Sequence, residues 1–498
     1  MADRIAPEDP RDPRPEQPER RSGRRSVLAL AALAPLALSV GAVAITAPSS
    51  PREVEHATAQ SQPGPSTRWC YGPLELPEGA LEAGPDADLA ITPPSPEVSL
   101  RAVSVEPESS LLFGRVSASR TLQEDDGSVR APSITAETAD GSVIGDEPAS
   151  QDLGFSVLGA SGVAGAPHVT SATSDGGRPV PDVIQATLTA SGDFRSYALT
   201  RCGEPGTEAS FLGVSTAKGD SSVLVLRNPT ERPATASVQL WTQDGPAAME
   251  GRSQVVVAPG EEQRVLLESV TPGEDALGVG VSVLGAPLSM HVQSTERDGL
   301  TPGGAEILSP LPAAGTELMM PGVEVAGAAP TLVLANPQGS GTTASVEVVG
   351  PDGPVEAGAR EEVDVPAGTV VSIPLEGVAD GTYAVDVRSQ DPITAVTRSE
   401  LTGADLPGDT IGAPVDFTLV PPAPEIGSHA MSSLPAQASA GRLMLIGSAP
   451  SAATVIPMAA DGSAGEPCAG RLLMAWEPII TWMHSFIMAF SVTPIVQQ

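Results

Sequence analysis

An internal duplication, with a spacing of 108 residues, constrains the fold of this chain more than any other feature. Residues 224–229 (LVLRNP) recur as residues 332–337 (LVLANP). At the same shift residues 244–246 match residues 352–354, both reading Asp-Gly-Pro, and apolar positions continue to match as far as Val378. So long a match without a gap indicates two copies of one structural unit.

Each copy has the pattern of short β-strands. Ala236, Val238 and Leu240 alternate with polar residues, as in a strand with one buried face. The Asn-Pro pair ends the preceding apolar run, because proline has no N–H to give to a ladder. Further strands are expected at residues 255–257, 264–267 and 279–283, and in the second copy at 363–365, 370–373 and 383–387. Strands at this spacing over roughly 100 residues predict an all-β chain of tandem immunoglobulin-like or fibronectin-like β-sandwich modules.

The repeat divides the chain into segments. Residues 68–203 have no aligned counterpart but contain four strand-like stretches, at 98–105, 111–116, 184–189 and 197–199, which predict a divergent β-rich domain. A third copy begins near Leu443 and fades after Asp461-Gly462. We predict a cytoplasmic tail at 1–26, an anchor or signal segment at 27–47, a Pro/Ser-rich linker at 48–67, the divergent domain at 68–203, repeat 1 at 204–311, repeat 2 at 312–415, a partial repeat 3 at 416–467 and an anomalous tail at 468–498.

Residues 27–47 carry no charge and are long enough to cross a bilayer core of about 30 Å. Four arginines stand before this segment, at positions 20, 21, 24 and 25, which predicts a single-pass transmembrane helix with the following residues outside the cytoplasm. The alternative is a secreted protein, because Ala42-Val43-Ala44 could be a signal-peptide cleavage site near Ala44.

Composition excludes some partners. With 61 acidic and 27 basic residues the net charge is −34, whereas phosphate binding needs a basic surface. We therefore expect no nucleic-acid partner. Lys218 is the single lysine among many arginines, and with the high Ala, Gly and Pro content this favours a GC-rich genome such as that of an actinobacterium.

The cysteines predict one disulfide bond. Cys70 opens the first folded segment and Cys202 closes it, and an exported chain lies in a compartment that permits disulfides. The alternative is two buried free thiols. No CxxC or HxxxH pair exists, so we expect no zinc site and no other metal site.

The composition changes from Cys468 onward, where aromatic residues become frequent and acidic residues nearly vanish. Three interpretations are open: a frameshifted end, a second membrane anchor at residues 478–496, or a genuine structural tail.

No catalytic constellation is visible in the sequence. The histidines at positions 56, 168, 291, 429 and 484 are isolated, and His291 on an expected strand is interpreted as structural. GxSxG, HExxH, GxGxxG and P-loop patterns are missing from the sequence. We therefore expect neither an enzyme nor a cofactor.

Several of these motifs together resemble an uncharacterised actinobacterial family of exported proteins. They are Trp69-Cys70-Tyr71-Gly72-Pro73, Cys202, Gly213-Val214-Ser215-Thr216 and the run 224–229. The resemblance covers residues 20–467 and implies a membrane-anchored or secreted modular protein, but it supplies no active site because the family's function is unknown.

The leading functional hypothesis is a non-catalytic envelope protein, a scaffold or accessory that contacts envelope proteins outside the cytoplasmic membrane. A second hypothesis is an array of modules that bind cell-wall carbohydrate. Sugar sites usually need aromatic platforms, yet Trp241 is nearly the only candidate and its counterpart in the second copy is Val349. A third is a hydrolase of envelope polymers, which would need a carboxylate pair in a cleft.

Overall fold

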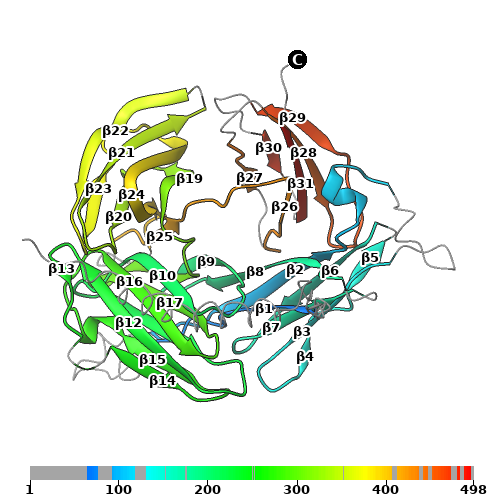
Figure 1. The fold of residues 1–498 in the computed structure, drawn as a ribbon, viewed down its shortest axis with the longest axis horizontal. Coiled ribbons are helices and arrows are strands. Elements are labelled where there is room, and N and C mark those ends of the chain that lie inside the picture. The colour runs from blue at the N-terminus through cyan, green and yellow to red at the C-terminus, as the bar shows by residue number, and fades with distance from the viewer. Residues whose placement is uncertain are drawn as a thin grey trace, which may run out of the picture. The chain divides into compact units, whose positions relative to one another are not determined.

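The structure is a computed structural model. It describes residues 64–76, 92–117, 130–151, 153–173, 177–249, 251, 253–351, 353–406, 412–436, 441–446, 451–472, 479–482 and 487–494. These residues form β-strands and two short 3₁₀ helices, which confirms the all-β prediction (Figure 1). In this part of the chain no helix has the length and apolar character needed to span a bilayer. The predicted anchor at 27–47, the tail before it and most of the linker at 48–67 lie outside the described residues.

Repeat 1 consists of two packed sheets. Its strands are β10 (Glu208–Val214), β11 (Ser221–Arg227), β12 (Ala234–Thr242), β13 (Gly245–Pro246), β14 (Gln254–Val257), β15 (Glu262–Leu266), β16 (Leu277–Gly285), β17 (Ser289–Asp298) and β18 (Thr301–Leu308). One sheet has the order β10-β16-β12, with β13 and β14 both beside β12, and the other has the order β15-β11-β17-β18. The alternating residues Ala236, Val238 and Leu240 of β12 are buried against Leu224 and Leu226 of β11, so the core lies between the sheets.

Repeat 2 has the same strand order. Its strands are β19 (Gly315–Val325), β20 (Thr331–Ala335), β21 (Thr342–Gly350), β22 (Gly353–Val365), β23 (Val370–Pro374), β24 (Gly381–Thr402) and β25 (Val415–Val420). The first sheet of repeat 1 is matched by the strands β19, β24, β21 and β22, in which β22 takes the place of both β13 and β14. The second sheet, β15-β11-β17-β18, is matched by β23, β20, β24 and β25 in that order. Each expected strand of the two copies is found, and β25 completes repeat 2 just beyond residue 415.

The repeated Asn-Pro element is a hydrogen-bonded clamp. The buried Asn228 amide donates to the carbonyls of Arg232 (2.7 Å) and Val257 (3.1 Å). Asn336 donates in the same way to the carbonyls of Ser340 (2.8 Å) and Val365 (3.0 Å), each 108 residues further on. In both copies the clamp ties the end of one sheet's central strand to a strand of the other sheet.

The strand order differs from that of an immunoglobulin sandwich. In an immunoglobulin sandwich the sixth and seventh strands are neighbours in one sheet. When β13 and β14 are counted as one strand, as in their counterpart β22, the sixth and seventh strands of repeat 1 are β16 and β17, and they belong to different sheets. The reason is their connection: the two strands follow each other through Ala286-Pro287-Leu288 without a hairpin, and in repeat 2 they are one continuous strand, β24.

The first domain shares this order, although its sequence shows no match. Its strands are β1 (Ser66–Trp69), β2 (Glu97–Val105), β3 (Ser133–Glu137), β4 (Val143–Ile144), β5 (Ala149–Gln151), β6 (Phe155–Ser161), β7 (His168–Ala172), β8 (Val180–Thr189) and β9 (Ser196–Arg201). The sheets β1-β7-β3-β4 and β6-β2-β8-β9 repeat the arrangement of repeat 1, and β5 adds a further strand beside β6. The expected strand at 111–116 is wrong, because Ser110–Phe113 form the 3₁₀ helix η2, in which the Ser109 hydroxyl accepts from the Leu111 N–H.

The last part of the chain begins the arrangement again. Its strands are β26 (His429–Ser432), β27 (Gly441–Leu443), β28 (Ser451–Met458), β29 (Cys468–Leu472), β30 (Ile479–Trp482) and β31 (Ile487–Pro494). The sheet order β26-β31-β28-β29 is that of β10-β16-β12-β13, and β27 pairs with β30 as β11 pairs with β15. The described residues of the segment 468–498 therefore occupy strand positions of a third copy.

Candidate functional site

Corresponding positions in the two repeats contact the preceding module. Leu226 pairs with Met290 in repeat 1, and the equivalent Leu334 pairs with Ala395 in repeat 2. Three residues further along each strand stand Gln293 on β17 and Arg398 on β24. Gln293 binds the segment that follows Cys70 in the first domain, and Arg398 binds repeat 1. The candidate functional site is therefore a pair of polar junctions between modules.

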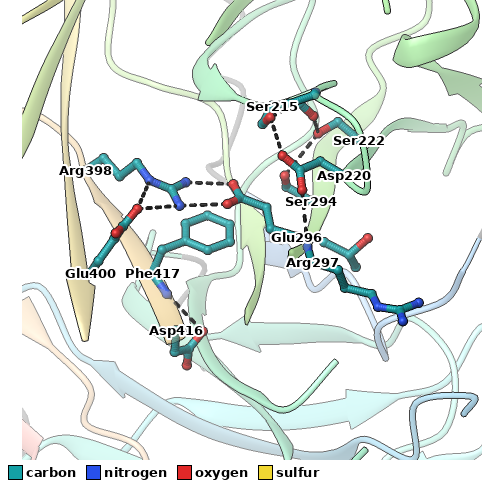
Figure 2. Close-up of polar contacts among 12 residues, drawn as sticks. Ser215, Asp220, Ser222, Ser294, Glu296, Arg297, Arg398, Glu400, Asp416 and Phe417 are labelled. Carbon is teal, nitrogen blue, oxygen red and sulfur yellow. Dashed lines mark hydrogen bonds and ion pairs between the residues drawn. The ribbon is translucent and has the colours of Figure 1, made fainter. Parts of the chain in front are cut away.

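Arg398 forms the centre of the junction between the repeats. Its guanidinium donates two hydrogen bonds, both of 2.7 Å, to the carboxylate of Glu296 on β17, and one of 3.0 Å to Glu400 (Figure 2). The guanidinium carbon lies 4.1 Å from the ring centroid of Phe417 on β25, within cation–π distance. The side chains of Arg398 and Glu296 are only 18% and 12% exposed. Burial raises the pKa of Glu296, and the hydrogen bonds and charge of Arg398 oppose that rise.

Two further carboxyl groups lie beside this ion pair. Asp416 accepts hydrogen bonds from the backbone N–H of Phe417 (3.1 Å) and of Tyr197 on β9 of the first domain (2.9 Å). Glu306 on β18 is buried and accepts from the N–H of Ile307. Burial and the nearby charge of Asp416 raise the pKa of Glu306 to about 8, and burial raises the pKa of Asp416. Strands of three modules therefore meet at these two carboxyl groups.

A serine-rich corner of repeat 1 completes the surroundings. Asp220 accepts a hydrogen bond of 2.6 Å from the hydroxyl of Ser215 and one of 3.2 Å from the Arg297 N–H, and Ser222 shares a hydrogen bond with Ser294 (Figure 2). The groups drawn together here are carboxylate, hydroxyl and backbone, an arrangement that orders the turn between β10 and β11.

Apolar contacts surround the junction between the repeats. Trp241 packs beside Leu212 of repeat 1 and Val333 and Val370 of repeat 2. Its ring lies over Gly278 and Gly280 of β16, where a β-carbon would crowd or overlap it. Trp241, the main aromatic candidate for a sugar platform in the repeats, therefore lies at the boundary between them.

The segment after Cys70 forms the other junction. The side chain of Gln185 on β8 accepts from the N–H groups of Tyr71 (3.0 Å) and Gly72 (2.9 Å) and donates to the Gly72 carbonyl. From repeat 1, Gln293 accepts from the Glu75 N–H (3.1 Å) and donates to the Pro73 carbonyl (3.2 Å). Two amide side chains from different modules thus hold one short segment of backbone.

The two cysteines singled out in the sequence anchor this segment. Cys70 and Cys202 are disulfide-bonded, with 4.5 Å between their Cα atoms, and both are buried. A cavity of about 280 Å³ borders Cys202, with Tyr71 and Arg201 on one side and Ser289, Met290 and Ser309 on the other. Cys468 carries a free thiol.

Two of the described histidines pack against aromatic rings. His291 is buried 4.7 Å from the Tyr71 ring, and burial, with smaller contributions from Arg264 and Arg227, lowers its pKa to about 3. His168 stacks on Trp69 at 4.6 Å, and Arg227 of repeat 1 lies 5.6 Å from the centroid of the same tryptophan ring. In the described part of the chain no three His, Cys, Asp or Glu side chains gather in a way that could hold a metal ion.

Sequence reasoning missed the polar residues of the two junctions. Gln185, Gln293, Glu296, Arg398 and Asp416 have no motif, and only their place on otherwise apolar strands sets them apart. The signal that could have found two of them is the repeat, because aligning Pro287 with Pro392 brings Gln293 and Arg398 to one position.

Comparison with known proteins places these features in a family. Residues 157–471, which include both complete repeats, match the model of a family of unknown function, DUF5719. No curated protein and no solved structure is significantly similar to the chain. Since the match covers more than half of the residues, the chain belongs to the family of unknown function DUF5719.

Proposed function

We propose that this chain is a non-catalytic scaffold of the cell envelope, exported by its N-terminal segment and presenting tandem β-sandwich modules to envelope proteins. The observation that carries this proposal is the pair of junctions between modules. Gln293 and Arg398 occupy one strand position, and each reaches into the preceding module. Such contacts oppose independent motion of the modules, and a scaffold needs its binding surfaces held at fixed relative positions.

Two more features support an extracytoplasmic location. The disulfide between Cys70 and Cys202 is of the kind that persists in oxidising compartments. The uncharged segment at 27–47, preceded by four arginines, is the export or anchor signal of the proposal. On this proposal the protein stays in the cytoplasmic membrane with its modules outside, or is released after cleavage near Ala44.

The test is capture of neighbours by the full-length chain in its own host. A tagged chain would be crosslinked in intact cells, solubilised in detergent and purified, and the captured proteins identified by mass spectrometry. The Arg398→Met variant is the matched comparison, because it changes a junction between modules and leaves the exposed faces intact.

The scaffold proposal expects the same few membrane or envelope proteins with the unaltered chain, and fewer of them with Arg398→Met. Recovery of cell-wall polysaccharide without protein would instead support carbohydrate binding and refute the scaffold. Capture of unselected proteins equal to that by a secreted control domain would refute it as well.

A further inference from the structure

The last strands of three modules lie against one another. β9 of the first domain and β25 of repeat 2 both contact β18 of repeat 1, and each is at the edge of its own sheet. An edge strand exposes unpaired backbone groups unless something covers it. Here side chains join the strands: the Thr200 hydroxyl on β9 donates to the Ile307 carbonyl on β18 at 2.7 Å, and the Tyr197 N–H donates to Asp416 on β25.

Backbone approach at this point is very close. Gly304 on β18 has φ +94°, and a β-carbon there would lie 2.9 Å from the Cα of Asp416. The Asp416 carboxyl group therefore sits directly on the β18 backbone. Glu306, two residues along β18, is buried beside it and hydrogen-bonds to its neighbouring N–H.

The charges that face the two carboxyl groups are unevenly distributed. Glu296 on β17 and Glu400 on β24 add negative charge nearby, and both are engaged by Arg398. β9 contributes the Tyr197 N–H, which donates to Asp416, and Arg195 precedes that strand. Arg297 extends toward the Phe194 ring, at 5.7 Å from its centroid. In the described residues no cation forms an ion pair with Glu306 or Asp416.

We propose that the contact of β9, β18 and β25 is a proton-controlled latch, which stays closed while Glu306 is protonated and opens when Glu306 loses its proton. A buried carboxylate without a paired cation is strongly disfavoured, and a second carboxylate beside it adds repulsion. Opening the contact lets water reach Glu306. Loss of one proton on opening makes the open state more populated as pH rises.

Hydrogen exchange measured by mass spectrometry on the full-length chain tests the latch directly. The amides of β9 and β18 are the reporters, and those of β12 and β21 inside the sandwiches are the internal control. After correction for the intrinsic exchange rate, protection of the reporters should fall by up to about tenfold per pH unit between pH 5 and 8, because one proton leaves on opening. The control strands should keep their protection over the same range.

Matched variants assign the effect to Glu306. Glu306→Gln keeps the shape of the protonated carboxyl group but cannot ionise, so the pH dependence of the reporters should disappear. Glu362→Gln, an exposed carboxyl group on β22, should leave it unchanged. Asp416→Asn removes the neighbouring negative charge, so Glu306 should lose its proton at lower pH. The midpoint of the pH dependence of the reporters should therefore move to lower pH, and a move to higher pH would contradict the latch.

Two results would overturn the inference. One is reporter protection in the unaltered chain that does not change with pH, a result that needs no variant to fold. The other is a slope in Glu306→Gln equal to that of the unaltered chain. Either outcome leaves the scaffold proposal open, because a scaffold does not require its junctions to depend on pH.

Discussion

Replacement of Arg398 by methionine is the sharpest test of the junction between the repeats. Methionine keeps most of the apolar stem and removes the guanidinium. The variant loses two charge-assisted hydrogen bonds of 2.7 Å to Glu296 and the contact with the Phe417 ring. The ion pair with Glu400 adds little, because the Glu400 side chain is 44% exposed and water screens it.

The expected cost follows from burial. Removing one partner of a buried ion pair costs about 3–5 kcal/mol, because the other charge stays buried without compensation. Glu296, 12% exposed, is in this position. Burial raises the pKa of Glu296, so protonation offers partial relief, and the cost should be smaller at pH 5 than at pH 8.

The assay is urea unfolding of the purified chain, followed by circular dichroism and fitted for each transition, because a chain of several modules need not unfold in one step. The double variant Glu296→Gln/Arg398→Met should recover at least about 2 kcal/mol relative to Arg398→Met, since it buries no unpaired charge. Arg178→Met is the control: Arg178 and Glu204 are 62% and 46% exposed, so their pair is worth at most about 0.5 kcal/mol. Equal losses in Arg178→Met and Arg398→Met, or no recovery in the double variant, would refute the reasoning.

Three further predictions concern stability. Replacing Cys70 and Cys202 by serine should destabilise the first domain by about 2–5 kcal/mol, because the disulfide closes a long loop, and the loss should vanish when both proteins are measured in reductant. Replacing Asn336 by alanine should cost about 1–3 kcal/mol and mainly affect repeat 2, because the carbonyls of Ser340 and Val365 lose their donor; Gln338→Ala, whose backbone rather than side chain takes part, is the control. The depressed pKa of His291 means that the unfolded chain binds a proton between pH 6.5 and 3 that the folded chain does not. The contribution of His291 to the unfolding free energy should therefore fall as pH drops through this window, by about 2 kcal/mol at pH 5, and it should appear as the difference between the urea titrations of the unaltered chain and of His291→Phe.

Local patterns made the repeats predictable. A strand can be predicted from the period-two alternation at Ala236, Val238 and Leu240, and the end of another from the Asn-Pro pair. Both signals depend only on residues close in the sequence, and the structure contains those strands. The expected strand at 111–116 failed for an equally local reason, since Ser109 caps a 3₁₀ turn and Gly114 ends it at φ 71°. Apolar residues in a row do not distinguish the two.

Strand order and the polar junctions could not be predicted in this way. The strand β17 pairs with β11 and not with β16, because the chain leaves the first sheet near Pro287. Where the chain changes sheets is a property of the whole sandwich. Arg398 and Glu296 are 102 residues apart, and the residues around each of them do not indicate that the two side chains form an ion pair. The first domain shows the same limit, because apart from the added strand β5 its strand order is that of repeat 1 without a matching sequence.

The continuous strand β24 has a mechanical consequence. It is hydrogen-bonded to β19 and β21 in one sheet and to β20 and β25 in the other. In repeat 1 the equivalent path is interrupted between β16 and β17 at Ala286-Pro287. A pulling force on the chain can therefore peel one sheet of repeat 1 from the other at this break, whereas in repeat 2 it must shear both sheets together. Repeat 2 should be the part of the described chain that resists tension longest.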